Sequence, residues 1–243
     1  FSPLTRQIPA SLAHSQDAPL VTAGLVVLSL AAMIIELQGQ TLSAKTVAML
    51  GVMVAVTSVL RFIGTAVPLP GGFSPIFAPI ILGGFVFGGR FGFLLGAFTL
   101  LTSALMTGGV GPWLPYQMFT AGWVGLSSGA LGRLNRRYRA AQDRLSTAEV
   151  WGLALFGLFW GLVYGAIMNL YFWPYAVGSS DQIWDYGISL GETLARYGAF
   201  YLATSLWWDA ARGIGNLVLL LILARATVRA LRRFQRSFHY EVS

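Results

Sequence analysis

Residues 150–172, VWGLALFGLFWGLVYGAIMNLYF, form an apolar run without a single charged residue. An α-helix needs about 20 mostly apolar residues to cross the hydrocarbon core of a bilayer, so this run is long enough to span it. The same reasoning predicts membrane helices over six other segments: 20–35, 44–63, 76–88, 91–106, 113–131 and 198–223. The sequence therefore predicts an all-α polytopic membrane protein.

Composition agrees with a membrane protein and excludes most enzyme classes. Of the 243 residues, 56% are apolar and 10% charged, whereas soluble domains carry about 25% charged residues. The chain has no cysteine, and its two histidines lie near its ends, at positions 14 and 239. Phosphate-binding loops, zinc-protease motifs and nucleophile elbows are absent from the sequence. We expect no catalysis, no metal site and no cofactor.

The basic charge is explained by topology. The net charge is +7, which in a soluble protein would indicate a nucleic-acid partner. If every apolar run spans, Lys45, Arg90 and two arginine groups, in residues 133–149 and after residue 223, fall on one side. The positive-inside rule makes that side the cytoplasm. We therefore expect the N-terminus outside, the C-terminus inside, no nucleic-acid partner, and an attraction to anionic lipid.

Small residues recur at four-residue spacing on several predicted helices. Such rows let two helix backbones approach closely in lipid, and intramolecular packing is their commonest use. One row is expected to be interrupted near Arg90. The rows are Gly84, Gly88, Gly92 and Gly96; Gly157, Gly161 and Gly165; and, on the first of the six later helices, Ala44, Ala48, Gly51 and Ala55.

A polar network is predicted inside the last span. Asp209, Arg212 and Asn216 share one helix face, with Ser205 a turn before them. In a helix beginning near Gly198, Asp209 would lie about 16 Å from the helix start, close to the bilayer midplane. A charge at that depth must be paired and face the protein interior. The group is either a structural ion pair or the floor of a ligand cavity, and the sequence leaves both open.

A second set of candidates lies at the predicted outer ends of the helices. An interfacial aromatic belt explains many of the tryptophans and tyrosines there. The amides of Gln117 and Asn169 are not explained by such a belt, and they favour a cavity that binds a flat organic ligand. The candidate substrate-binding residues are Arg61, Trp113, Tyr116, Gln117, Asn169, Trp173 and Asp209.

Three stretches resemble a known family. They are FSPIFAPIILG at 73–83, GGVGPWLPYQ at 108–117 followed by AGWVG at 121–125, and WDAARGIGN at 208–216. Together they make residues 44–236 similar to the substrate-binding S component of energy-coupling factor (ECF) vitamin transporters, most of all its cobalamin-type branch. Riboflavin and queuosine-precursor binders share the same frame.

The resemblance implies an organisation and a set of partners. It implies a six-helix S-component domain over residues 44–228, followed by a basic cytoplasmic tail, 229–243. The segment before this domain, 1–43, with its additional predicted transmembrane helix, departs from the family pattern. The resemblance also implies a multi-pass protein of a prokaryotic plasma membrane that binds a vitamin from outside. A membrane-embedded coupling (T) subunit would dock on Ala44, Ala48, Gly51 and Ala55, and two cytosolic ATPases would supply the energy.

Two rival functions remain open at this point. The chain could be a structural or accessory membrane subunit of a larger complex, with its aromatic residues packed against lipid or pigment. Alternatively, it could be a proton-coupled carrier that works through Asp209.

Overall fold

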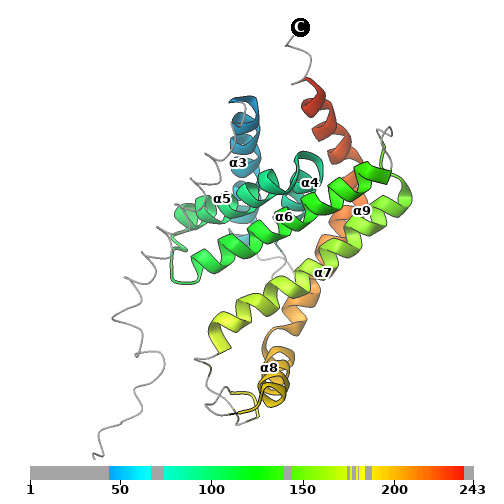
Figure 1. Ribbon diagram of the computed structural model, residues 1–243. Helices are drawn as coiled ribbons and strands as arrows, with labels where there is room; N and C mark the ends of the chain where they lie inside the picture. Colours follow the sequence, from blue (N-terminus) through cyan, green and yellow to red (C-terminus); the bar gives the residue numbers. More distant parts are fainter. Residues whose placement is uncertain are drawn as a thin grey trace, which may run out of the picture.

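The computed structural model describes residues 44–66, 74–138, 144–173, 176, 179, 181–183 and 188–237. Within these ranges the regular structure is entirely helical, which confirms the predicted all-α class (Figure 1). The additional helix predicted over residues 20–35 lies outside the described residues. The helices are α3 (Ala44–Ala66), α4 (Phe77–Phe87), α5 (Gly89–Thr107), α6 (Leu114–Tyr138), α7 (Thr147–Phe172), α8 (Leu190–Thr204) and α9 (Leu206–Ser237).

Helix α4 forms the centre of the bundle. Nine of its 11 residues are buried, and it contacts α5, α6, α7 and α9. A helix that is apolar on all sides is expected to be surrounded by others. At 1.5 Å per residue α4 is too short to cross a bilayer alone. It ends at Gly88, whose φ of +103° is accessible to glycine without strain. The row of glycines is therefore interrupted at Gly88, and Arg90 lies within α5.

Helices α5 and α6 pack backbone to backbone through small residues. A Cβ atom on Gly92 would overlap the backbone of Gly125, and one on Gly96 would overlap the backbone of Ala121. Gly84 of α4 faces the same Gly125 carbonyl. These contacts confirm the packing role predicted for the row, except at Gly88, where a Cβ would meet nothing within 4 Å.

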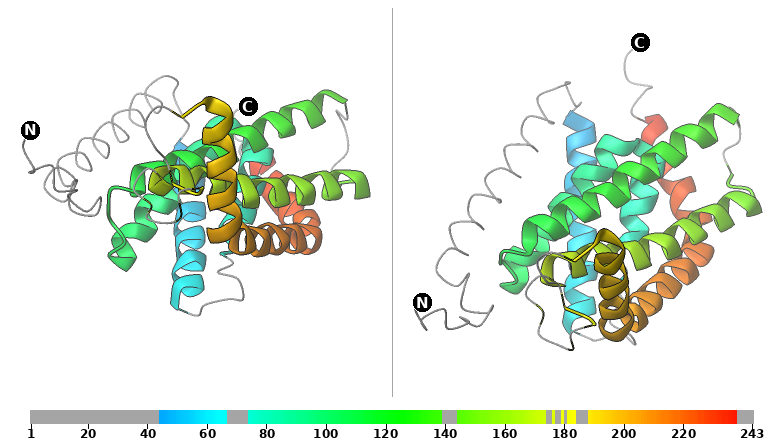
Figure 2. Two further views of the ribbon diagram at one scale, coloured as in Figure 1. Left: turned by 90° about the horizontal axis from the view of Figure 1, so that it is seen from below. Right: turned by 60° about the horizontal axis from the view of Figure 1, so that its bottom comes forward.

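The single last span predicted from Gly198 is wrong: two helices occupy this region. α8 and α9 are separated at Ser205, whose φ and ψ are −125° and −27°. Figure 1 views α8 nearly end-on while α9 runs up the page, and the left view of Figure 2 shows α8 along its length. The Ser189 side chain caps α8 by accepting the Glu192 N–H at 3.2 Å, and Glu192 pairs with Arg196 one turn later. The sequence alone favours a loop over residues 173–196, because this segment has no long apolar run; the structure shows that its end is helical.

Other predicted boundaries also shift because helices continue into polar sequence. α6 extends to Tyr138, and α7 begins at Thr147 behind a capping box of Ser146 and Glu149. Of the arginine-containing segment 133–149, they take up residues 133–138 and 147–149. α9 continues to Ser237, so the domain boundary predicted at residue 228 falls inside it. Leu231, 9% exposed, still belongs to the core.

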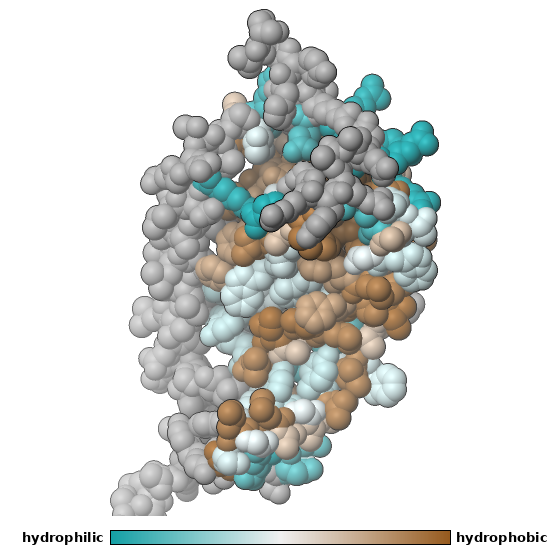
Figure 3. Space-filling model, turned by 45° about the vertical axis from the view of Figure 1, so that its right-hand side comes forward, coloured by the Kyte–Doolittle hydropathy of each residue, from teal (hydrophilic) through white to brown (hydrophobic). Residues whose placement is uncertain are grey.

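Four of the described helices are long and apolar enough to cross a membrane: α3, α5, α7 and residues Leu206–Gln235 of α9. Figure 3 shows a broad apolar belt on the surface, with hydrophilic residues gathered above it.

The arginine-rich segments share one end of the bundle. Arg225 of α9 donates from Nη2 to Thr147 Oγ1 of α7 at 2.8 Å, and Gly132 of α6 lies against the Phe85 backbone of α4. Leu131 and Asn135 of α6 line one hollow with Ser146 and Glu149 at the start of α7, so the two basic segments lie at the same end of the bundle. The side of the membrane that this end faces stays a prediction. We call this end the arginine-rich end, and the other the opposite end.

Candidate functional site

α7 packs against α9 along two complementary rows of residues. On α7, Gly157, Gly161, Gly165 and Asn169 recur at four-residue spacing. Their partners on the antiparallel segment follow in reverse order: Asn216 with Leu220, then Gly213, Asp209 and Ser205. We call this contact the α7–α9 seam. It confirms the packing role predicted for the second glycine row.

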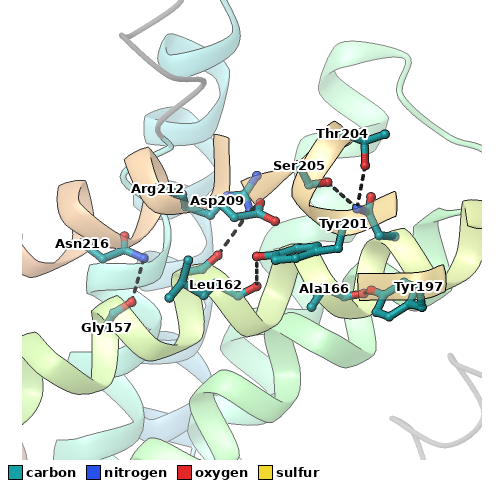
Figure 4. A network of polar contacts seen from close by, with 12 residues as sticks. Gly157, Leu162, Ala166, Tyr197, Tyr201, Thr204, Ser205, Asp209, Arg212 and Asn216 are labelled. Atoms are coloured by element: carbon teal, nitrogen blue, oxygen red, sulfur yellow. Dashed lines mark hydrogen bonds and ion pairs between the residues drawn. The ribbon is translucent and has the colours of Figure 1, made fainter. Parts of the chain in front are cut away.

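The predicted polar network lies within this seam (Figure 4). Asp209, only 2% exposed, forms an ion pair with Arg212. Gly165 makes room for the pair, because a Cβ at that position would overlap the Asp209 carboxylate. Arg212 Nη1 also lies 3.4 Å from the Gly161 carbonyl oxygen, and Asn216 Nδ2 donates to the Gly157 carbonyl at 3.3 Å. The network thus joins α9 to the backbone of α7.

Asp209 lies near the start of its helix rather than several turns inside it, which differs from the expected position. The helix begins at Leu206 instead of near Gly198, so Asp209 is in the first turn of α9. There the positive end of the helix dipole favours a carboxylate. Trp207 and Trp208, 79% and 58% exposed, are typical of an interface. From Trp208 to Arg229 the helix rises about 30 Å, the thickness of the hydrocarbon core.

Two tyrosines that the sequence interpretation missed attach α8 to α7. The hydroxyl of Tyr197 donates to the Ala166 carbonyl, and that of Tyr201 donates to the Leu162 carbonyl at 3.4 Å (Figure 4). Burial, and then the charge of Asp209, raise the pKa of both tyrosines to about 12. Both hydroxyls therefore remain protonated donors at neutral pH. Their four-residue spacing continues through Ser205 to Asp209, and this series was a signal that could have revealed them.

The predicted aromatic residues meet at the opposite end of the bundle. The rings of Tyr116 on α6 and Tyr171 on α7 have centroids 4.8 Å apart. Trp113, 36% exposed, donates from its indole nitrogen to the Gly109 carbonyl at 3.3 Å. Gln117, one turn after Trp113, is half-buried. The structure therefore brings Tyr116 next to the end of α7.

Asn169 and Trp173 have intramolecular partners. The Asn169 amide donates to the Ser205 hydroxyl and, at 3.4 Å, to the Thr204 hydroxyl. Trp173, 5% exposed, donates from its indole to the Gln182 carbonyl at 2.8 Å, and its ring packs 5.1 Å from that of Tyr197. Both side chains hold the α8 region against the end of α7.

Tyr164 of α7 connects Arg61 to the rest of the site. The positive charge of the Arg61 guanidinium on α3 acts on the Tyr164 hydroxyl. The Arg212 guanidinium carbon lies 5.6 Å from the centroid of the same ring, and Phe77 of α4 packs edge-on against it at 4.9 Å. Helices α3, α4, α7 and α9 therefore meet around Tyr164. Two arginines, Arg61 and Arg212, lie in this region, and the carboxylate described there is that of Asp209.

Comparison with known proteins identifies the family. Residues 45–224 match the family model of the ECF transporter, substrate-specific component. The chain belongs to this family. No curated protein and no solved structure gave a significant match. The protein is therefore an S component, a substrate-binding subunit of a membrane transporter, and its family implies partnership with ECF T and ATPase subunits.

The predicted docking stripe of this S component lies on the surface of α3. All four of its small residues are exposed in the described structure, and a Cβ on Gly51 would meet nothing within 4 Å. The stripe residues are Ala44, Ala48, Gly51 and Ala55.

Among the residues that the structure describes, no cluster of three histidine, cysteine, aspartate or glutamate side chains is arranged to hold a metal ion.

Proposed function

We propose that this S component is the high-affinity vitamin-binding subunit of an ECF-type ABC importer, with cobalamin as the favoured vitamin. The observation that carries the proposal is the convergence of aromatic and polar side chains at the opposite end of the bundle. There Tyr116 and Tyr171 join α6 to α7, and Arg61 reaches from α3 to Tyr164. Partner subunits hydrolyse ATP, and the S component binds and delivers the vitamin.

The chemistry of this end supports a large ligand with hydrogen-bonding groups. Trp113, Tyr116 and the Gln117 amide offer flat apolar surface with a directed hydrogen bond, the usual make-up of an organic ligand site. Two arginines beside one described carboxylate favour a ligand that carries negative charge or strong acceptors. Cobalamin has both, in its phosphodiester and its amide side chains. We assign Asn169, Trp173 and Asp209 positioning roles, because each has an intramolecular partner.

The double substitution Trp113→Ala with Gln117→Ala should weaken cobalamin binding about tenfold or more, since it removes an aromatic wall and an amide from the site. Titration calorimetry of the purified protein measures this loss. Trp151→Ala is the matched control, because Trp151 is also exposed, at 48%, but lies near the start of α7 at the arginine-rich end. Binding within twofold of wild type in the double variant would contradict this placement of the site.

We also propose an orientation and a docking surface. Arg133, Arg225 and their neighbours at the arginine-rich end favour a cytoplasmic location for that end, by the positive-inside rule. This puts the C-terminus in the cytoplasm of a prokaryotic cell and the vitamin site outside. The exposed small residues of α3 favour close contact with a helix of the T subunit.

Ala48→Leu should prevent assembly with the T subunit and the two ATPases, because a bulky side chain separates two helices that approach through small residues. Co-purification of the complex measures this effect, and vitamin binding should stay unchanged. Ala203→Leu, at a position on α8 that is also exposed, is the control and should assemble normally. Normal assembly of Ala48→Leu would place the coupling surface elsewhere.

The two alternative functions, a proton-coupled carrier and a structural subunit, differ from our proposal in the vitamin uptake and binding that they predict. A proton-coupled carrier working through Asp209 would take up vitamin in cells that lack the ATPases, and Asp209→Asn would abolish that uptake. A structural subunit would bind no vitamin and would co-purify with proteins other than ATPases. Our proposal predicts uptake that requires the ATPases. The pairing of Asp209 with Arg212 inside the α7–α9 seam favours a structural role for this carboxylate.

A further inference from the structure

The last turns of helix α9 border a hollow that is lined by both arginine and apolar side chains. The hollow has a volume of about 530 Å³ and is lined by Ala226, Arg229, Ala230, Arg233 and Phe234. The two alanines leave a groove along the helix, and the two arginines stand on its border one turn apart. This surface has no part in the proposed vitamin site, which lies at the opposite end of the bundle.

An apolar row leads into the hollow from the membrane. Ile214, Val218 and Ile222 follow each other at four-residue spacing and are 57%, 44% and 67% exposed. The same spacing continues through Ala226 and Ala230 to Phe234, which is 56% exposed. With 3.6 residues per turn, Arg229 and Arg233 lie on the same side of α9 as Val218 and Ile222, whereas the positions from Ala226 to Phe234 wind progressively away from Ile214.

The depth of the arginines matches that of lipid phosphates. Arg229 lies about 30 Å along the helix from the exposed Trp208, which equals the hydrocarbon thickness of a bilayer. Arginine binds phosphate through paired hydrogen bonds, and basic hollows on the cytoplasmic side of membrane helices bind anionic headgroups. An acyl chain could lie along the apolar row while the phosphate contacts Arg229 and Arg233.

We propose that this hollow is a binding site for one anionic phospholipid, with the headgroup phosphate at Arg229 and Arg233 and an acyl chain along Ile214, Val218 and Ile222. Its location in the inner leaflet rests on the orientation proposed above. The lipid contact itself does not depend on which vitamin the protein carries, or on whether it carries one.

Native mass spectrometry of the full chain in detergent tests this site, with phosphatidylglycerol and phosphatidylcholine as probes. Wild-type protein should retain phosphatidylglycerol in preference to phosphatidylcholine. Arg229→Gln with Arg233→Gln should weaken phosphatidylglycerol binding about tenfold, since two charge-assisted contacts are lost. The control, Arg133→Gln with Arg144→Gln, removes the same charge from exposed positions of the same end outside the hollow, and should change binding less than twofold.

A second variant tests shape separately from charge. Ala230→Leu keeps both arginines but fills the groove, so it should also weaken phosphatidylglycerol binding. Equal losses in the two arginine pairs, or equal retention of the two lipids by wild type, would overturn the proposal. It would also be overturned if the Arg229 and Arg233 double variant kept its lipid but no longer assembled with the T subunit, because the surface would then be a protein contact.

Discussion

Gly161→Ala should lower the free energy of unfolding of this S component by about 1–3 kcal/mol, the usual cost of overfilling a packed interior. A Cβ atom at Gly161 would overlap the Gly213 backbone of α9. A backbone cannot rotate away as a flexible side chain can, so α7 and α9 must separate along the seam. Thermal unfolding in detergent measures the change as a lower Tm.

Gly152→Ala is the matched control on the same helix. A Cβ at Gly152 would meet nothing within 4 Å, and alanine favours a helix interior over glycine by about 1 kcal/mol. This variant should therefore be as stable as wild type or more stable. If both substitutions changed the Tm equally, the seam would not be the close contact described here.

Arg212→Gln should lower the free energy of unfolding by about 3–5 kcal/mol, because it leaves the buried Asp209 carboxylate without its partner. The double variant Asp209→Asn with Arg212→Gln should recover much of this loss, since no unpaired charge remains. Denaturant unfolding of the singles and the double gives the coupling between the two residues. Arg196→Gln is the control, because its partner Glu192 is 48% exposed and such pairs contribute under about 1 kcal/mol.

The same double variant separates the two roles that the sequence left open for Asp209. If the ion pair only holds α7 and α9 together, the stable double variant should still bind the vitamin. Loss of binding in a double variant with restored stability would make Asp209 or Arg212 a ligand residue.

Much of the fold could be predicted from the sequence, because a bilayer constrains it strongly. Uncharged runs such as residues 150–172 can only be buried in lipid or protein, and backbone groups in lipid must be paired within a helix. The glycine rows predicted close helix crossings, which the structure places at Gly92 with Gly125 and at Gly161 with Gly213.

The region between Trp173 and Asp209 was predicted poorly for a physical reason. Charged residues such as Glu192 favour a loop over residues 173–196, yet Glu192 and Arg196 pair with each other on a capped helix. Hydropathy cannot detect such a helix, and it cannot detect the break at Ser205 either. The predicted depth of Asp209 followed from that missed break.

The candidate site was predicted only in part, because partners depend on tertiary contacts. The sequence placed Tyr116 and Asn169 at the same end of the bundle. It could not show that Tyr116 meets Tyr171 or that the Asn169 amide is bound to Ser205. Tyr164, on which Arg61 and Arg212 converge, had no signal in its local sequence.

Native mass spectrometry of the full chain, purified from cells supplied with vitamins, tests the central claim most directly. We expect a population carrying one small organic molecule per chain, identified as cobalamin after its release, and a loss of that population in the Trp113→Ala and Gln117→Ala double variant. A chain that carries no small molecule, even when incubated with cobalamin, riboflavin or a queuosine precursor, would contradict the proposal that this S component binds a vitamin.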